Sequence, residues 1–288
     1  MFDLRYHVAS LAAVFLALII GILVGVGVSD PVDNAKTRLL ERRVADLEGQ
    51  LDQRTDRSTR LDRERAAAQR FINETYPTLV RNRLKGKQVA VLFVGSADGA
   101  VRTAVKDALA DAGAQQLRLR AIKVPIDAKQ LNAALKSAPV AGSFVGPDRM
   151  DQVGRALGQE LVFGGETPTW DALNDFVEER VGGGKKPADG VVVVRNVAPQ
   201  RAATSRLLLG LYNGLTSSPA PAVGVETTDA AHSATEVFRK AGLSTVDDVD
   251  SRVGRYALVL LLAGAQSGQY GVKDSAEDPL PPLPTPGG

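Results

Sequence analysis

The sequence of 288 residues contains no cysteine, and it has only two methionines and two histidines. Without cysteine the chain can form neither a disulfide nor a thiolate metal site. The formal net charge is +2, so no large basic surface is expected and nucleic acid is not an expected partner. About 260 residues remain after the first uncharged segment, enough for one medium-sized domain with its own core.

Catalytic motifs are also missing. The chain has no nucleophile elbow and no H-E-x-x-H helix, and an acid–base mechanism through histidine would depend on His232 alone, because His7 lies beside the apolar N-terminal segment. We therefore expect a protein that is not an enzyme, and we assign no cofactor and no catalytic residue.

Two short polar segments have both a binding and a structural interpretation. The turn 95–99 comes after an apolar run but lacks the G-x-G-x-x-G spacing and the P-loop lysine, so Asp98 is expected to cap a helix. Asp247, Asp248 and Asp250 could hold a hard cation through their carboxylates. The same spacing also fits the end of a strand that leads into a helix capped by Asp250 or Ser251.

The N-terminus carries the clearest signal. Residues 8–28 form an apolar run of 21 residues without a formal charge, long enough to cross a bilayer as a helix. Arg5 precedes the run and two aspartates come after it, which favours a short cytoplasmic N-terminus of residues 1–7 and export of the chain beyond residue 28. A cleaved signal peptide is the alternative, but its apolar region is usually shorter.

Small residues recur at every fourth position of this predicted anchor. Such a ridge lets two membrane helices approach closely, and it includes a G-x-x-x-G pair. The predicted self-association residues are Ala13, Ala17, Gly21, Gly25 and Ser29. The alternative is that small residues are simply common in membrane helices.

A stalk is predicted over residues 36–76, which are rich in arginine and carboxylates and contain no proline. Apolar residues at alternating spacings of three and four favour a coiled coil, and hence a homodimer. The predicted seam residues are Leu40, Val44, Leu47, Leu51 and Leu61. Polar residues at Arg54, Ser58 and Arg65 interrupt the seam, so a single solvated helix is the alternative. Pro77 is expected to end or kink this helix.

The remainder, residues 86–271, alternates between strand and helix patterns. Strands are expected at 88–94, 117–124, 140–145, 191–195 and 221–226, and helices at 101–112, 127–136, 150–162, 168–181, 200–215, 234–241 and 253–265. This order predicts a Rossmann-like, three-layer α/β domain with a mostly parallel sheet. Residues 272–288 contain five prolines and are expected to form a disordered tail.

Two blocks of sequence carry a resemblance to a known family. The first is the opening MFDLRYHVASLAAVFLAL with the glycines after it, and the second combines residues 244–250, 254–259 and 268–271. Over nearly its whole length the chain resembles the actinobacterial MctB copper-transporter family. The resemblance implies a role in copper homeostasis or transport in the cell envelope. A related protein, SteB, is instead described as an envelope partner in daughter-cell separation.

The chemistry of copper argues against direct copper transport by this chain alone. Copper(I) prefers thiolate and thioether ligands, and this chain offers only Met1 and Met150. One membrane span and an α/β body also make no pore. We therefore expect a single-pass membrane protein that affects copper only indirectly, as a dimeric scaffold that meets an envelope partner protein. The alternatives are a cell-separation role like that of SteB, or a cytoplasmic nucleotide- or metal-binding domain with its pocket at Ser96 and Asp98.

Overall fold

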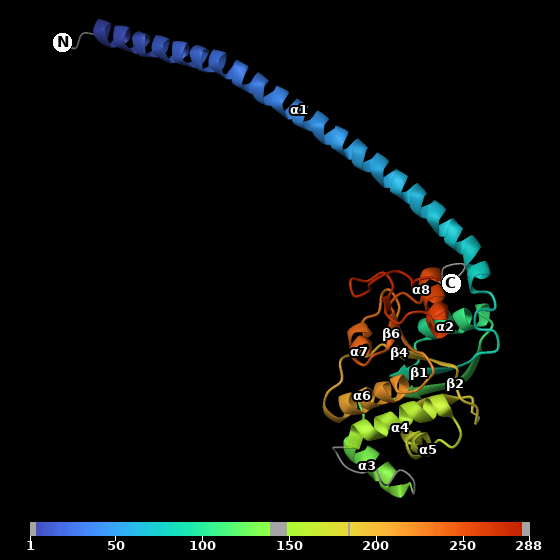
Figure 1. The fold of residues 1–288 in the computed structure, drawn as a ribbon. Coiled ribbons are helices and arrows are strands. Elements are labelled where there is room, and N and C mark those ends of the chain that lie inside the picture. Colours follow the sequence, from blue (N-terminus) through green and yellow to red (C-terminus); the bar gives the residue numbers. More distant parts are fainter. Residues whose placement is uncertain (1–3, 139–148, 184, 284–288) are drawn as a thin grey trace. The chain divides into compact units, whose positions relative to one another are not determined.

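The computed structural model describes residues 4–138, 149–183 and 185–283, with side chains omitted for residues 4–9 and 26–37. The chain divides into two compact units, residues 1–69 and 70–288, and each is described by itself. Figure 1 shows a long N-terminal helix and an α/β unit.

The first unit consists of helix α1, which runs from Leu4 to Val80 and ends inside the second unit. Its described side chains before Gln69 are exposed, and Arg60 and Glu64 form an ion pair one turn apart at 3.0 Å. No helix in the part of the chain that the structure describes is both long and apolar enough to span a membrane. The anchor at residues 8–28 therefore stays a prediction. The helix does not end at Pro77, although Pro77 interrupts its hydrogen-bond ladder.

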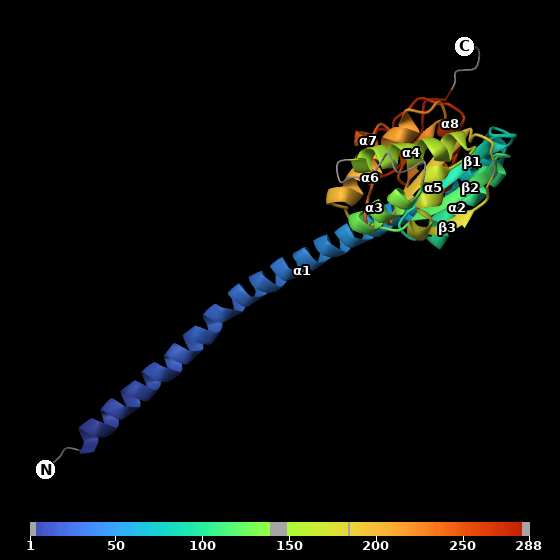
Figure 2. The same ribbon diagram turned by 90° about the horizontal axis from the view of Figure 1, so that it is seen from below.

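The second unit is built on a seven-stranded sheet with the order β3-β2-β1-β4-β5-β6-β7. All neighbouring strands are parallel except β3, which pairs antiparallel with β2. Figure 2 shows β1, β2 and β3 side by side at one end of the sheet. The strands are β1 (Gln88–Val94), β2 (Gln115–Ile122), β3 (Val177–Val181), β4 (Gly190–Arg195), β5 (Ala222–Val225), β6 (Ser244–Val246) and β7 (Gln269–Tyr270). The prediction of a mixed α/β protein with a mostly parallel sheet is confirmed.

Helices cover both faces of this sheet. They are α2 (Gly99–Asp111), α3 (Ala128–Ser137), α4 (Met150–Phe163), α5 (Pro168–Ala172), α6 (Ala202–Thr216), α7 (Thr235–Lys240) and α8 (Arg252–Leu262). One core joins the sheet to α2, α8 and the end of α1, and the other joins it to α3, α4, α6 and α7 (Figure 1). Along β4, Val192 and Val194 face the first core, whereas Val191 and Val193 face the second. Both faces are buried, which explains the uninterrupted apolar strands.

Helices α4 and α6 pack through glycine. Gly154 and Gly158 on α4 and Gly210 and Gly214 on α6 are spaced by four residues, so each pair lies on one face of its helix. A Cβ atom at any of these four glycines would collide with the main chain of the opposite helix. The backbones therefore approach more closely than larger residues would allow.

The helix predicted over residues 168–181 is wrong in its second half. Helix α5 ends at Ala172, a 3₁₀ turn spans Asn174–Phe176, and residues 177–181 form strand β3. Alternating burial along Val177–Val181 suits an edge strand with one covered face. The strand predicted at 140–145 lies outside the described residues.

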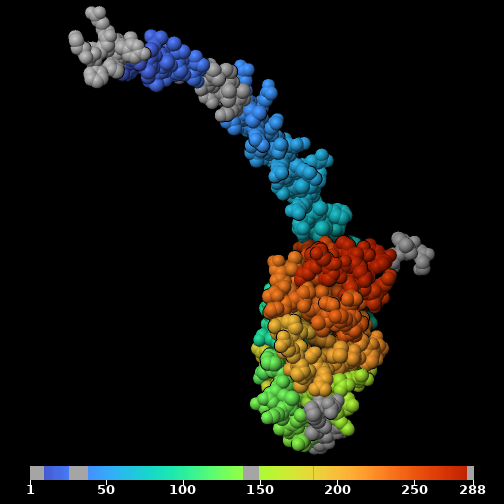
Figure 3. Space-filling view, turned by 90° about the vertical axis from the view of Figure 1, so that its left-hand side faces the viewer, coloured from blue at the N-terminus to red at the C-terminus, as the bar shows by residue number. Residues whose placement is uncertain are grey.

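The C-terminal segment is ordered as far as it is described. Composition predicts disorder from residue 272, but Val272 and Lys273 donate hydrogen bonds to Asp247, and Leu280 packs against the first core. In the space-filling view these red residues lie on the surface of the α/β unit beside the orange elements (Figure 3). The folded unit therefore includes residues 272–281.

Candidate functional site

The carboxyl ends of β5 and β6 gather buried carboxylates. Glu226 directly follows β5, and Asp247 and Asp248 directly follow β6. All three side chains are at most 3% exposed. Ligands of doubly wound sheets bind at this edge, so the cluster is the first candidate site in the fold.

Asp247 binds the C-terminal segment. Its Oδ1 accepts a hydrogen bond from the Val272 amide at 2.8 Å, and its Oδ2 accepts one from the Lys273 amide at 3.2 Å. Gly271 has a φ of 141° and lies so close that a Cβ atom there would collide with the Asp247 carboxylate. This carboxylate therefore holds a turn of the main chain.

Glu226 binds the same segment through a charge. Lys273 Nζ lies 2.6 Å from Glu226 Oε1 and donates a second hydrogen bond to the Thr227 carbonyl at 2.9 Å. Glu226 also accepts hydrogen bonds from the Ser233 hydroxyl at 2.9 Å and the Ala234 amide at 2.7 Å. We call residues 271–281, with these bonds to Asp247 and Glu226, the C-terminal strap.

Asp248 is the least satisfied of the three carboxylates. Ser251 donates a hydrogen bond to its Oδ2 at 2.7 Å, but its Oδ1 is buried without a partner. Burial raises the pKa of this carboxyl, and the charges of Asp247 and Asp250 raise it further, while the Ser251 hydrogen bond opposes the change. Ser251 in turn caps α8 by accepting from the Gly254 amide. Of the two caps predicted, Ser251 is therefore the one used.

The other polar positions singled out in the sequence have separate roles. Asp250 accepts from the Thr228 amide, and Asp98 caps α2 by accepting from the Ala100 and Val101 amides. His232 is exposed in a loop. Within the described residues, no three His, Cys, Asp or Glu side chains form a group that could hold a metal ion. Sequence reasoning missed Glu226 and Lys273, because their contact joins residues 47 positions apart.

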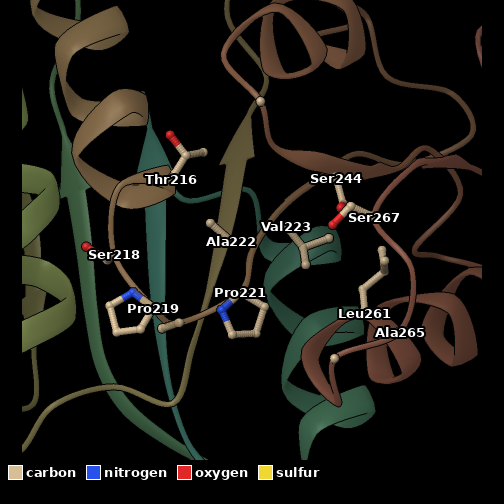
Figure 4. A pocket seen from close by; sticks show the side chains of 13 residues that line it. Thr216, Ser218, Pro219, Pro221, Ala222, Val223, Ser244, Leu261, Ala265 and Ser267 are labelled. Atoms are coloured by element: carbon tan, nitrogen blue, oxygen red, sulfur yellow. The ribbon is translucent and has the colours of Figure 1, made fainter.

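A cavity of about 360 Å³ opens at the opposite, amino-terminal edge of the sheet. Figure 4 shows Ser244 and Ser267 on one side of it and Pro219 and Pro221 on the other. Its lining contains no charged side chain, and its polar groups are hydroxyls and main-chain atoms. It offers neither an acid–base pair nor a counter-charge for an ionic substrate.

The predicted self-association residues lie on α1. The seam side chains are largely exposed: Leu40 61%, Val44 52%, Leu47 54%, Leu51 62% and Leu61 49%. Ala13, Ala17, Gly21 and Gly25 are exposed too, and a Cβ atom at either glycine would meet no atom within 4 Å. Ser29 lies in α1, but its side chain is outside the described set.

The end of α1 is held by the α/β unit. Tyr76 is 3% exposed, the Arg252 guanidinium lies 5.2 Å from its ring centroid, and its hydroxyl is buried without a hydrogen-bond partner. Burial, together with Asp111, raises the pKa of Tyr76 well above its usual value. Arg255 and Asp107 pair beside it at 3.6 Å. The last turns of α1 are therefore part of the first core.

Comparison with known proteins shows the family of this chain. The chain matches the family described as "Copper transport outer membrane protein, MctB" over residues 1–281. The chain belongs to the MctB family. Copper transporter MctB of Mycobacterium bovis and copper transporter MctB of Mycobacterium tuberculosis are each 29% identical to it, over 96% of this chain and 98% of theirs.

The second block of sequence that resembles the MctB family lies at the carboxyl edge of the sheet and in α8. Residues 244–250 are strand β6 and its carboxylates, residues 254–259 belong to α8, and residues 268–271 form β7 and the close turn against Asp247. In this MctB-family chain the block thus contains Asp247, Asp248 and the turn at Gly271 that lies against Asp247, whereas Glu226 and Lys273 lie outside it. Met150, one of two methionines, is 1% exposed in the second core.

Proposed function

We propose that this MctB-family protein is a single-pass envelope protein that acts as a non-catalytic dimeric scaffold with a role in copper homeostasis. In this proposal residues 8–28 anchor it, the next part of α1 pairs with a second copy, and the α/β unit is exported. Family membership supports the copper role and the envelope location. The exposed seam of α1 carries the scaffold proposal.

The seam argues for a second copy of the same helix. Leu40, Val44, Leu47 and Leu51 follow heptad spacing and are each more than half exposed. Complete burial of a leucine or valine side chain contributes roughly 1.5–3 kcal/mol, so a paired seam would offset the cost of association. Because the pattern is self-complementary, an identical helix is the simplest partner.

Copper is proposed to be affected indirectly. The chain has no thiolate, and Met150 is packed among apolar side chains of the second core. The buried carboxylates at the carboxyl edge bind main-chain amides, hydroxyls and Lys273. Soft copper(I) would find few preferred ligands in such surroundings.

Crosslinking of the full-length protein in native membranes tests the scaffold. Gly21→Ile with Gly25→Ile would block close helix approach, and Leu47→Lys with Leu51→Lys would place like charges in the seam. We expect each pair to reduce the crosslinked dimer partly and all four changes to abolish it, because two linked contacts reinforce each other.

Leu39→Lys is the matched control, since Leu39 is 61% exposed and lies outside the seam. It should crosslink like the unmodified protein. A dimer that survives all four substitutions would place association elsewhere in the chain and reject the scaffold.

A further inference from the structure

The carboxyl end of β4 places a buried positive charge without a partner. Arg195 is the last residue of β4 and is 6% exposed, on the face that carries α6 and α7. Its Nε is buried and has no hydrogen-bond partner. Among the described residues, no carboxylate forms an ion pair with it. An unpaired buried charge is costly, so this one requires an explanation.

The carboxylate nearest in register is already engaged. Val194 pairs with Val225, which places Arg195 and Glu226 next to each other at the ends of neighbouring strands. Glu226, however, is bound to Lys273, Ser233 and Ala234. Glu226 is therefore not available as a counter-charge for the Arg195 guanidinium.

A buried tyrosine lies beside it. Tyr212, on α6, is fully buried. Burial raises the pKa of Tyr212 to about 12, and the neighbouring Arg195 guanidinium opposes this rise through its charge and a hydrogen bond. Tyr212 therefore supports the guanidinium, and Arg195 is the donor available to an anion.

Both groups line one small pocket between α6 and α7. Its volume is about 160 Å³, and its lining is mostly apolar, with Leu208, Leu209 and Val237 as walls. Leu209 is 48% exposed and Val237 is 36% exposed, so the apolar walls reach the surface. Lys240 also lines it and is paired with Glu236 at 2.7 Å.

The start of α6 adds to the positive character of this region. Gln200 and Ser205, on either side of the first turn of α6, line the pocket. This turn has no side-chain cap, and Ala202 has a φ of 49°, which is uncommon for a residue with a Cβ atom. Strained backbone of this kind is often found at functional sites, and helix N-termini favour negative charge.

We propose that this pocket, named here the Arg195 pocket, binds a small carboxylic acid with a short apolar chain. The carboxylate accepts hydrogen bonds from the Arg195 guanidinium, and the chain lies against the apolar walls. Guanidinium groups pair strongly with carboxylates, which accounts for the buried charge. The volume corresponds to roughly five water molecules at ~30 Å³ each, which suits a carboxylate with a few methylene groups.

Calorimetry with hexanoate on the full-length protein in a nonionic detergent tests the proposal. We expect saturable binding that weakens at least tenfold in Arg195→Met, while Arg195→Lys keeps part of the affinity. Hexan-1-ol and hexylamine carry the same chain without a carboxylate, and neither should compete. Inorganic phosphate lacks the apolar chain and should bind much more weakly.

Arg239→Met is the matched control, because it removes the same charge from an exposed position on α7. It should bind hexanoate normally. Thermal unfolding gives a second measurement: without ligand, Arg195→Met should unfold no earlier than the unmodified protein, and hexanoate should raise only the latter's midpoint. If hexanoate does not bind, or binds Arg195→Met as tightly as the unmodified protein, the Arg195 pocket is not a carboxylate site.

Discussion

Gly154 on α4 lies directly against the main chain of Leu207 on α6, and a Cβ atom at Gly154 would collide with the Leu207 carbonyl oxygen. The same Cβ would lie 2.7 Å from the Leu211 nitrogen. Main-chain atoms of a packed helix cannot rotate away as a side chain can. The two helices therefore depend on glycine at their contact.

We expect Gly154→Ala and Gly210→Ala each to lower the free energy of unfolding by about 3 kcal/mol, the upper end of the usual cost of overpacking. Denaturant unfolding can be followed through Trp170, the only tryptophan, whose indole donates to the Leu157 carbonyl on α4. Gly99→Ala is the control, because a Cβ atom there meets nothing within 4 Å. Unchanged stability of both α4 and α6 variants would show that the helices can separate at little cost.

The C-terminal strap should contribute strongly through Lys273. Replacing Lys273 by Met leaves Glu226, which is 3% exposed, without its counter-charge, so we expect the free energy of unfolding to fall by about 3 kcal/mol. Lys240→Met removes an exposed pair with Glu236 and should change stability by less than about 0.5 kcal/mol. In the double variant Glu226→Gln with Lys273→Met, part of the lost stability should return, because the uncompensated buried charge is removed. Equal effects of the two lysine substitutions would contradict a role for the strap in stability.

Asp248 should make the stability of the α/β unit depend on pH. Its pKa is raised in the folded chain, so protonation favours the folded state. This contribution is complete below the unfolded carboxyl pKa of about 3.9 and is lost as the pH rises through the folded value. Asp248→Asn should therefore raise the unfolding midpoint by a few degrees at pH 7, and the gain should shrink toward pH 4. Asp229→Asn, at an exposed position, should show no such trend.

The proposed topology can be tested because the chain has no cysteine of its own. Lys185 is exposed in the α/β unit, and Lys185→Cys should react in intact cells with a thiol reagent that cannot cross the membrane. Labelling only after lysis would place the α/β unit in the cytoplasm. The same chain without the added cysteine is the blank.

Local signals in the sequence predicted much of the fold. Residues 88–94 are expected as a strand and form β1 with the same bounds, and Asp98 caps its helix as expected. These features depend on neighbouring residues, namely an apolar run or a carboxylate ahead of a helix. The four-residue spacings of Gly154 and Gly158 and of Gly210 and Gly214 are an equally local signal for the α4–α6 contact.

Features that depend on distant partners could not be predicted in this way. Strand β3 is short and charged, and it exists because β2 offers it an edge and Arg102 pairs with Glu179 at 2.8 Å. The strap was expected to be disordered because its prolines outweigh its apolar residues, yet Asp247 and Glu226 supply partners that composition does not reveal. The unpaired Arg195 is visible only once the carboxylates around it are assigned.

Strand β1 lies inside the sheet, between β2 and β4, and this position limits the order in which the sheet can form. Its two neighbours are β2, which comes within about 30 residues, and β4, which begins at Gly190. The first residue of β1 also depends on this distant segment, because the Gln88 amide donates a hydrogen bond to the Asp189 carboxylate, 101 residues further along the chain. One of the two edges of β1 therefore stays unpaired until β4, which ends at Arg195, has been synthesised. Pairing between strands so far apart in the sequence slows folding. Until then, this edge of an apolar strand presents unpaired N–H and C=O groups, to which an extended segment of another chain can add.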